Sequence, residues 1–439
     1  MENPAPAPPS ARAAFTVAGL GIAAGSIVFG SATRVPLFAD DYHYLATVQT
    51  PGWWHSSAIW DPAGSPFTHH FRPGLFLWFG FVHRLFGLHP VPMHIATGLI
   101  VFAGAVLTGL VARRLGLGSG AYAAAVVYGL HTTMAIPIAW NSAANSPLAT
   151  TFALGALYCM LRPRLRGLDV IAACGLLLAG LMTREVVAVT PAVLFMARYA
   201  VEAHQQPGPR LKRSLVTSLP LWLVLIAYAI VRRLAGFVST AGPYQQRLTT
   251  HAFRNFGQLM EYATEFGYSR RYGAFVIAFW LVLIGLCAIA ALRFHRSQGL
   301  VGLAWIVFGV LPVVFLARQP MEYYYLDFAL PGLALAVGTV FECFASAAPE
   351  RAGIALTATC MTILVALSSY TAGREVHAFG RGAAQEEKVI VQVRRDHPHP
   401  APGTTIVLPI PKAAAGLKDY PDAIRVIFHD PTLHIAYSR

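Results

Sequence analysis

The feature that most constrains this chain is a series of apolar blocks, each about 17–22 residues long, that recur between residues 13 and 370. A helix of that length crosses the hydrocarbon core of a bilayer. Of the 439 residues, 56% are hydrophobic and only 12% are charged, whereas a soluble protein carries roughly twice that charged fraction. The mean hydropathy is +0.53. We therefore expect an all-α polytopic membrane protein.

The charge of the chain lies mainly between these blocks. The formal net charge is +13, and most of the cationic residues are arginines. Such a distribution indicates membrane topology and contact with anionic lipids, and it speaks against a nucleic-acid partner. Five cysteines lie within apolar blocks without the spacing of metal ligands, so we expect buried thiols: Cys159, Cys174, Cys287, Cys343 and Cys360.

Clusters of arginine alternate with the blocks in a way that predicts about eleven spans, because cytoplasmic loops are enriched in Lys and Arg. The segment Arg72–Phe86 is excluded from this count, since a helix of its length covers only roughly 22 Å and contains His83 and Arg84. The predicted spans are Ala13–Thr33, Met93–Ala112, Ala121–Ile138, Ala143–Leu161, Leu168–Met182, Val186–Ala200, Leu215–Val231, Gly273–Leu292, Leu300–Ala317, Leu326–Ala345 and Ala352–Tyr370.

The same patterns predict the domain organisation. Residues 1–12 form a disordered tail, and residues 13–370 form the membrane domain. Within it, residues 34–92 are a first extracytoplasmic loop with interfacial helices, and residues 232–272 are a second large loop. Residues 371–439 form a small extracytoplasmic α/β region. There we expect a helix over Arg374–Arg395 and strands over Thr404–Ile410 and Ala423–Phe428.

Two adjacent carboxylates, Asp40 and Asp41, follow the first apolar block. They require water or a polar cavity at the membrane surface. Like charges side by side raise one pKa, which suits a group that accepts a proton near neutral pH. The alternative is a solvated pair of loop residues without a chemical task.

The eleven-span topology brings the other unusual polar residues to the same membrane face as this pair, which predicts a shared aqueous cavity. Arginines that face a carboxylate pair suggest a phosphate site beside a general base. Two alternatives remain: Arg184 and Glu185 form an internal ion pair, or Arg318 is an anchor at the membrane interface. Besides the Asp pair, the candidates are His70, Arg72, Asn141, Asn145, Arg184, Glu185, Arg318, Glu322 and Tyr324.

The order of these residues resembles a known family. Asp40-Asp41-Tyr42 is followed by His70-Phe71-Arg72-Pro73, by a segment that ends in Met93-His94, by Ala139-Trp140-Asn141-Ser142 with Asn145, and by Thr183-Arg184-Glu185. This order is similar to that of GT-C glycosyltransferases, in particular the membrane part of protein O-mannosyltransferases and their TPR-bearing transmembrane relatives. The likeness extends over residues 13–200. The family has Lys where this chain has Arg184, and the TPR region is absent here.

The resemblance implies an inverting glycosyltransferase that moves a sugar from a polyprenyl-phosphate donor to an extracytoplasmic acceptor. Asp40 would be the catalytic base or its metal partner, and Asp41 the second carboxylate. His94 joins the substrate-binding residues above. The resemblance implies no defined metal site, and a weak divalent-cation site at Asp40 and Asp41 stays open. The acceptor is a glycan, a lipid or a protein.

The location that we expect is the cytoplasmic membrane of a bacterium, with the active site and the C-terminus outside the cytoplasm. Two other functions stay open from the sequence: a transporter or flippase of lipid-linked sugars, and an inactive relative that scaffolds an envelope complex. A transporter favours internal repeats and broken helices at mid-membrane, and neither is visible in the sequence.

Overall fold

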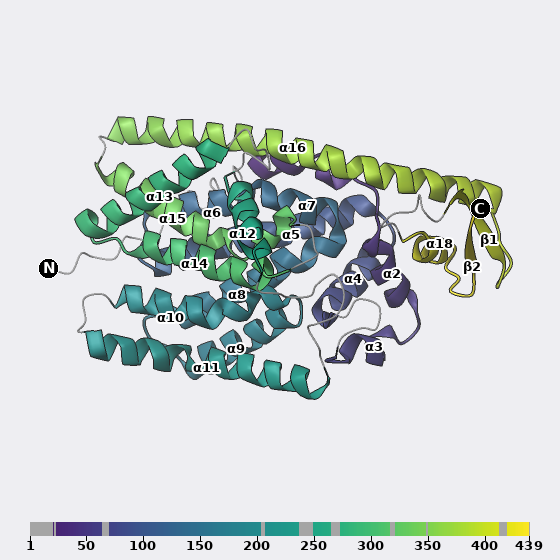
Figure 1. Ribbon diagram of the computed structural model, residues 1–439, viewed down its shortest axis with the longest axis horizontal. Helices are drawn as coiled ribbons and strands as arrows, with labels where there is room; N and C mark the ends of the chain where they lie inside the picture. The colour runs from purple at the N-terminus through teal and green to yellow at the C-terminus, as the bar shows by residue number, and fades with distance from the viewer. Residues whose placement is uncertain are drawn as a thin grey trace.

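The computed structural model is almost entirely helical and carries one small two-stranded sheet at its C-terminal end (Figure 1). It describes residues 21, 23–63, 70–202, 207–236, 249–264, 273–316, 321–347, 350–411 and 419–438. The expectations for the tail 1–12, for Arg318 and for part of the first span fall outside these residues. The protein is thus a multi-pass, all-α membrane protein with a small α/β appendage.

The elements of the first half are η1 (Ala32–Arg34), α2 (Asp40–Gln49), η2 (Trp53–His55), α3 (Ser57–Trp60), α4 (Pro73–Phe86), α5 (Pro90–Arg114), α6 (Ser119–Leu130), η3 (Thr132–Met134), α7 (Ala135–Ala139), η4 (Asn141–Ala144), α8 (Asn145–Met160), α9 (Gly167–Leu181), η5 (Glu185–Val189) and α10 (Thr190–Val201). Those of the second half are α11 (Pro207–Leu234), α12 (His251–Tyr262), α13 (Gly273–Phe294), α14 (Gln298–Val314), η7 (Tyr323–Leu326), α15 (Leu330–Ala347), α16 (Glu350–Asp396), β1 (Thr405–Pro411), α18 (Tyr420–Phe428) and β2 (His434–Ser438).

Four of the described helices are long and apolar enough to cross a membrane, namely α5, α11, α13 and α15. Helices α9 and α14 are shorter apolar helices. The predicted span Ala121–Ile138 is broken into α6 and a second helical piece, Thr132–Ala139. The two pieces meet at a bend of 42°. The break follows His131, whose side chain accepts the N–H of Thr133 at 3.1 Å and so competes with helical hydrogen bonding.

Helix α4 matches the segment that the sequence analysis excluded from the spans. It has 14 residues, and Pro73 at its start suits a first helical turn. It is not among the described helices that qualify as spans. One face, with Leu75 and Phe79, is fully buried. The membrane count of eleven stays a prediction.

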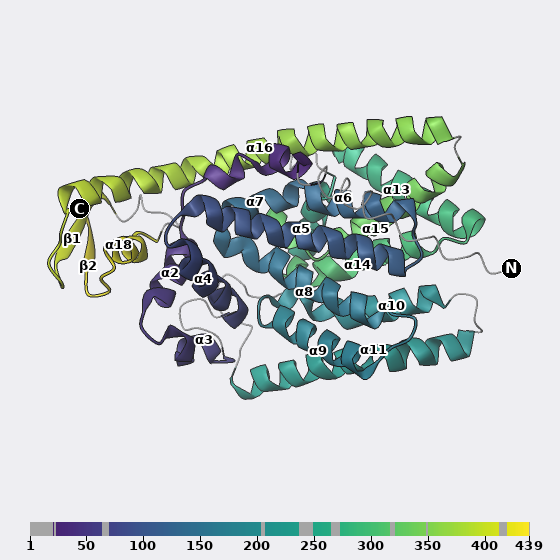
Figure 2. The ribbon, with the colours of Figure 1, turned by 180° about the vertical axis from the view of Figure 1, so that it is seen from behind.

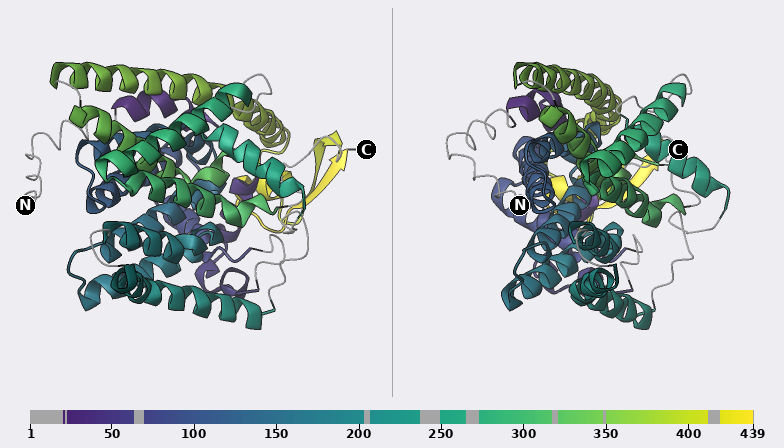
Figure 3. Two further views of the ribbon diagram at one scale, coloured as in Figure 1. Left: turned by 60° about the vertical axis from the view of Figure 1, so that its left-hand side comes forward. Right: turned by 90° about the vertical axis from the view of Figure 1, so that its left-hand side faces the viewer.

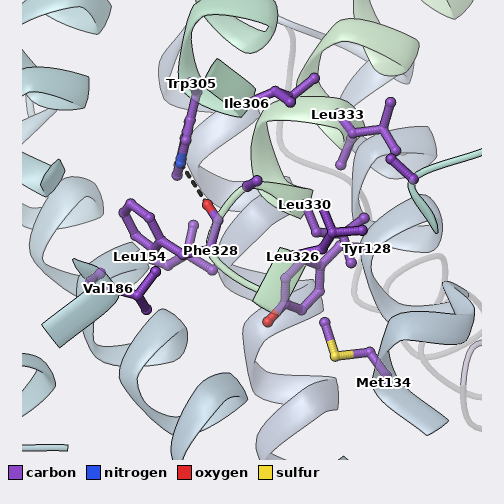
Figure 4. Close-up of a cluster of buried hydrophobic side chains, with 14 of the residues drawn as sticks. Tyr128, Met134, Leu154, Val186, Trp305, Ile306, Leu326, Phe328, Leu330 and Leu333 are labelled. Atoms are coloured by element: carbon purple, nitrogen blue, oxygen red, sulfur yellow. Dashed lines mark hydrogen bonds between the residues drawn. The ribbon is translucent and has the colours of Figure 1, made fainter. Parts of the chain in front are cut away.

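Small residues let the central helices approach closely, which is how helices associate in lipid. A Cβ added to Gly332 of α15 would lie 2.6 Å from the carbonyl oxygen of Gly302 in α14. Beside this crossing, the indole of Trp305 donates to the carbonyl oxygen of Phe328 at 2.8 Å, within a cluster of fully buried side chains (Figure 4). The core of the bundle therefore lies where α6, α8, α14 and α15 meet.

Helix α16 differs from the sequence prediction. We expected a span ending at Tyr370 and a separate helix over Arg374–Arg395, but both belong to one helix of 47 residues, about 70 Å long. Glycines in this stretch weaken a helix without ending it. In all views α16 lies on one side of the bundle and α11 on the opposite side (Figures 1 and 3).

The appendage confirms one predicted strand and corrects the other. Thr404–Ile410 matches β1, but Ala423–Phe428 lies in helix α18, and the second strand is β2, which pairs with β1 in parallel. Parallel strands need a crossover connection, and that connection is usually a helix. The helical spacing of the buried residues Ala423, Ile424 and Val426 fits this role.

The described residues of the appendage share their hydrophobic core with the first loop. Ile406 of β1 and Ile424 of α18 belong to the same buried cluster as Leu45 of α2 and Phe79 of α4. Seen from behind, α18 lies against α2 at one end of the molecule, and the sheet lies on the other side of α18 (Figure 2). The C-terminal region and the first loop therefore form one packed unit.

Candidate active site

Asp40 and Asp41 begin helix α2, and the fold gives them opposite environments. Asp40 is exposed, whereas Asp41 is fully buried. Oδ1 of Asp41 accepts both the N–H and the hydroxyl of Ser142, each at 2.7 Å. Oδ2 accepts the N–H of Phe38 at 3.2 Å. Asp41 thus connects α2 to the turn before α8, and Asp40 is the member of the pair that meets solvent.

Proton affinity also differs between the two carboxylates. Burial raises the pKa of Asp41 to about 7, the donors Ser142 and Phe38 oppose this, and the charge of Asp40 adds to it. The pKa of Asp40 is raised as well, because desolvation by the surrounding chain outweighs the opposing charges of His43 and Arg72. Asp41 therefore keeps its proton to a higher pH than an ordinary carboxyl, and the charge of Asp40 contributes to this.

The turn that holds Asp41 is itself fixed by a chain of polar contacts. Nε2 of the buried His94 lies 2.8 Å from the carbonyl oxygen of Val35. Its Nδ1 lies 3.3 Å from Nδ2 of Asn141. Oδ1 of Asn141 accepts the hydroxyl of Thr97 at 3.2 Å. One ring nitrogen that donates to a carbonyl and one that accepts from an amide describe a neutral imidazole.

Three residues after Ser142, Asn145 contacts the predicted phosphate residue Arg184. Nη1 of Arg184 donates to Oδ1 of Asn145 at 3.2 Å. Its guanidinium carbon lies 5.0 Å from the ring centres of both Tyr324 and Tyr325. Arg184 is buried. The short helix η4 therefore joins Asp41 and Arg184, and the structure gathers Asp41, Asn141, Asn145, Arg184 and Tyr324 as the sequence predicted.

A further acidic group belongs to this network, and the sequence analysis missed it. Asp327 is 1% exposed, and its carboxylate interacts with the charge of Arg184 and with Ser146. A carboxylate inside the predicted span Leu326–Ala345 was the available signal, since intramembrane acids are rare and paired. Ser142 belongs to the motif Ala139-Trp140-Asn141-Ser142 but was not among the candidate residues.

The other candidates lie at different places. Glu185 forms an ion pair with Arg232 of α11 at 3.3 Å rather than with Arg184. Arg232 follows the predicted span Leu215–Val231 at its outer end, where the enrichment of arginine in cytoplasmic loops does not predict one. The ion pair with Glu185 accounts for its position. Glu322 is exposed, and the pKa of its carboxyl is raised by desolvation and by Glu375. His70 is half-buried ahead of α4.

Among the described residues, one group has the spacing of metal ligands: His43, Asp419 and Asp422. Their ligand atoms lie within 4.8 Å of one another. Nδ1 of His43 lies 3.2 Å from Oδ2 of Asp422, and this ion pair already joins α2 to the appendage. Asp40 and Asp41 are not in such a group within the described ranges, so a cation at that pair stays a prediction.

No family model matches the chain, and no curated protein matches it. Solved structures do. The chain is similar to ArnT from Cupriavidus metallidurans, solved in the apo state and bound to undecaprenyl phosphate, with 13% identity and a TM-score of 0.56. In the apo comparison the match covers 96% of this chain and 86% of that chain.

An oligosaccharyltransferase from Archaeoglobus fulgidus, solved with zinc and sulfate, matches with 12% identity and a TM-score of 0.51. That match covers 96% of this chain and 62% of the archaeal enzyme. Both are GT-C glycosyltransferases. This chain has the GT-C fold. The fold predicted from the sequence is thereby confirmed, and the structural match covers nearly the whole chain.

Proposed function

We propose that this GT-C protein is a glycosyltransferase that moves a sugar from a polyprenyl-phosphate donor to an acceptor outside the cytoplasm. The observation that carries the proposal is the asymmetric pair at the start of α2, where an exposed Asp40 stands beside a buried Asp41. An ionised carboxylate in that position is suited to take the proton of an acceptor hydroxyl. Inversion at the sugar carbon follows from attack opposite the departing phosphate.

The leaving group is a lipid phosphate, and a guanidinium matches phosphate oxygens well. We assign this role to Arg72, because it is half-buried and its charge acts on Asp40. Arg184 is enclosed by two tyrosines and contacts Asn145. These contacts occupy its guanidinium, so binding of the donor phosphate by Arg184 is a separate prediction.

The neighbours support the class of donor. ArnT has been solved bound to undecaprenyl phosphate, and the archaeal enzyme AglB with dolichol phosphate and an inhibitory peptide. AglB matches at 11% identity with a TM-score of 0.50, over 97% of this chain and 65% of its own. By this proposal the protein lies in the cytoplasmic membrane of a bacterium, with Asp40 and the C-terminus outside. The acceptor is a glycan, a lipid or a protein.

The test is transfer of sugar from a synthetic polyprenyl-phosphate donor by purified protein. We expect Asp40→Asn to lower turnover by roughly 10²–10⁴-fold, the usual contribution of a general base. Binding of the polyprenyl phosphate should stay near the wild-type level, because Asn keeps the size of the side chain. The thermal unfolding temperature should also be unchanged.

The matched control is Asp61→Asn, the same change at another exposed position of the first loop. It should leave turnover unchanged. Full activity in Asp40→Asn would contradict the base assignment. No transfer by the wild type, together with movement of the lipid-linked sugar across vesicles by both proteins, would support the flippase instead.

A further inference from the structure

The residue before Asp40 has an unusual backbone conformation. Ala39 has φ 49° and ψ −120° and is buried. This is a region that glycine adopts readily and that residues with a Cβ rarely occupy. Such a conformation costs free energy and persists only where the surrounding structure holds it. The turn directly ahead of the proposed base therefore needs an external support.

Glu386 supplies a contact at this point. Its Oε2 accepts the N–H of Ala39 at 3.2 Å, although the two residues are 347 positions apart. Glu386 lies in the C-terminal half of α16 and is fully buried. About two turns earlier on the same helix, the ring of Phe379 packs edge-on against Phe38 at 5.1 Å. Helix α16 thus holds the turn through a ring contact and a hydrogen bond.

The surroundings of Glu386 join three segments. Burial raises the pKa of the Tyr42 phenol, and the charge of Glu386 adds to that effect. The same two causes raise the pKa of Tyr420 in α18 to about 12. A second contact follows on α2, where His43 pairs with Asp422 of α18 at 3.2 Å. The C-terminal segment therefore contacts α2 on both sides of Asp40.

We propose that Glu386 is a positioning residue that holds Ala39 in its strained conformation and so fixes the direction of Asp40. The C-terminal region then belongs to the active site as its support. The inference about catalysis rests on the proposed function, whereas the inference about the turn does not. Without an acceptor for its N–H, Ala39 relaxes to negative φ, and the first turn of α2 changes direction.

The first measurement compares Glu386→Ala with the wild type and with Glu387→Ala, a control at the neighbouring exposed position. Hydrogen exchange over residues 36–45 reports the turn, because the N–H groups of Asp41 and Tyr42 bond to Phe38 and Ala39 there. We expect faster exchange in Glu386→Ala alone. We also expect its kcat to fall roughly 10- to 100-fold, the effect of a small displacement of a reacting group, with a smaller change in the KM for the donor.

The second measurement separates support of the turn from loss of packing. Glycine adopts positive φ without strain, so Ala39→Gly combined with Glu386→Ala should recover several-fold in kcat over Glu386→Ala. Glu386→Gln keeps a carbonyl acceptor and should stay within a few-fold of the wild type. A fall in unfolding temperature that glycine does not reverse, without recovery of kcat, would assign Glu386 to packing alone and overturn the proposal.

The exchange experiment also separates the two proposals. Unchanged exchange in Glu386→Ala would overturn the positioning role, whether or not the wild type transfers sugar. Faster exchange in Glu386→Ala, in a protein whose wild type transfers no sugar, would keep Glu386 as the support of the turn. It would remove the proposed function instead.

Discussion

Asp41 combines complete burial with three hydrogen bonds from its neighbours, and its pKa is raised to about 7. The folded protein therefore binds a proton at Asp41 that the unfolded chain releases near pH 4. By linkage, a raised pKa stabilises the folded state below the unfolded pKa. That stabilisation is lost as the pH rises through the folded value.

We expect the unfolding temperature of the purified protein to fall as the pH rises from about 4 to about 7, the window set by the two pKa values of Asp41. His43 and Asp419 act in the same direction, since their pKa values are raised too. Asp41→Asn should flatten the curve partly. The measurement is thermal unfolding at several pH values.

Asp61→Asn serves as the control and should keep the wild-type slope. Asn at position 41 also places an amide near the N–H of Phe38, which lowers stability equally at all pH values. The slope is therefore the informative quantity. An Asp41→Asn protein with an unchanged slope would show that Asp41 is ionised in the folded state.

At the scale of elements, charged side chains connect helices at both ends of the bundle. At one end Glu342 of α15 accepts the N–H groups of Gly118 and Gly120 at the start of α6, each at 2.8 Å. At the other, Arg184 after α9 meets Asp327 ahead of α15. Removing one partner of such a pair leaves an uncompensated buried charge, which typically costs about 3–5 kcal/mol.

We expect Arg184→Ala to lower the unfolding temperature and the yield of folded protein, because Asp327 is left without its cation. Adding Asp327→Asn removes the stranded charge. The double variant should regain stability, and its turnover should return to within several-fold of the wild type. The measurements are thermal unfolding and donor KM for both variants and for Asp327→Asn alone.

The same variants test whether Arg184 binds the donor phosphate. A double variant that is stable but has a strongly raised donor KM would assign the phosphate to Arg184 rather than to Arg72. Glu185→Gln is the comparison at the adjacent position. It should affect only the pair with Arg232, which is partly exposed.

At the scale of the whole molecule, the appendage and the first loop share one buried cluster, and α16 connects it to the membrane bundle. Under the eleven-span arrangement, both lie outside the cytoplasm. Under the same arrangement, the basic segments that contain Arg164 and Lys212 lie in the cytoplasm. Each of these two residues is exposed, as is Gln385 on α16.

Cysteine labelling tests this topology, with single cysteines in a background from which the five native cysteines have been removed. We expect an impermeant reagent to label position 385 in intact cells, and positions 164 and 212 only after permeabilisation. Asn141 is unsuitable as a reporter, because it is fully buried. The reverse pattern would put Asp40 in the cytoplasm and contradict an extracytoplasmic acceptor.

Much of this architecture is readable from local patterns. Apolar blocks must be long enough to cross hydrocarbon, so their length indicates helices such as α5 and α13. Arg72–Phe86 is too short for a span, and it is a short helix of 14 residues. The order of polar motifs predicted the GT-C fold, and it also predicted that Asn145, Arg184 and Tyr324 come together.

What the sequence by itself determined is therefore the class of fold, the place of the Asp pair and the membership of much of the polar cluster. Only the tertiary structure decided which carboxylate meets solvent, and that Asp327 rather than Glu185 faces Arg184. The tertiary structure also shows that Tyr420–Phe428 is a helix rather than a strand. It shows that the carboxylate of Glu386 accepts the N–H of Ala39. The reason is physical: local periodicity reports which surface a segment buries, whereas burial of a charge and the partner of an N–H depend on residues hundreds of positions away.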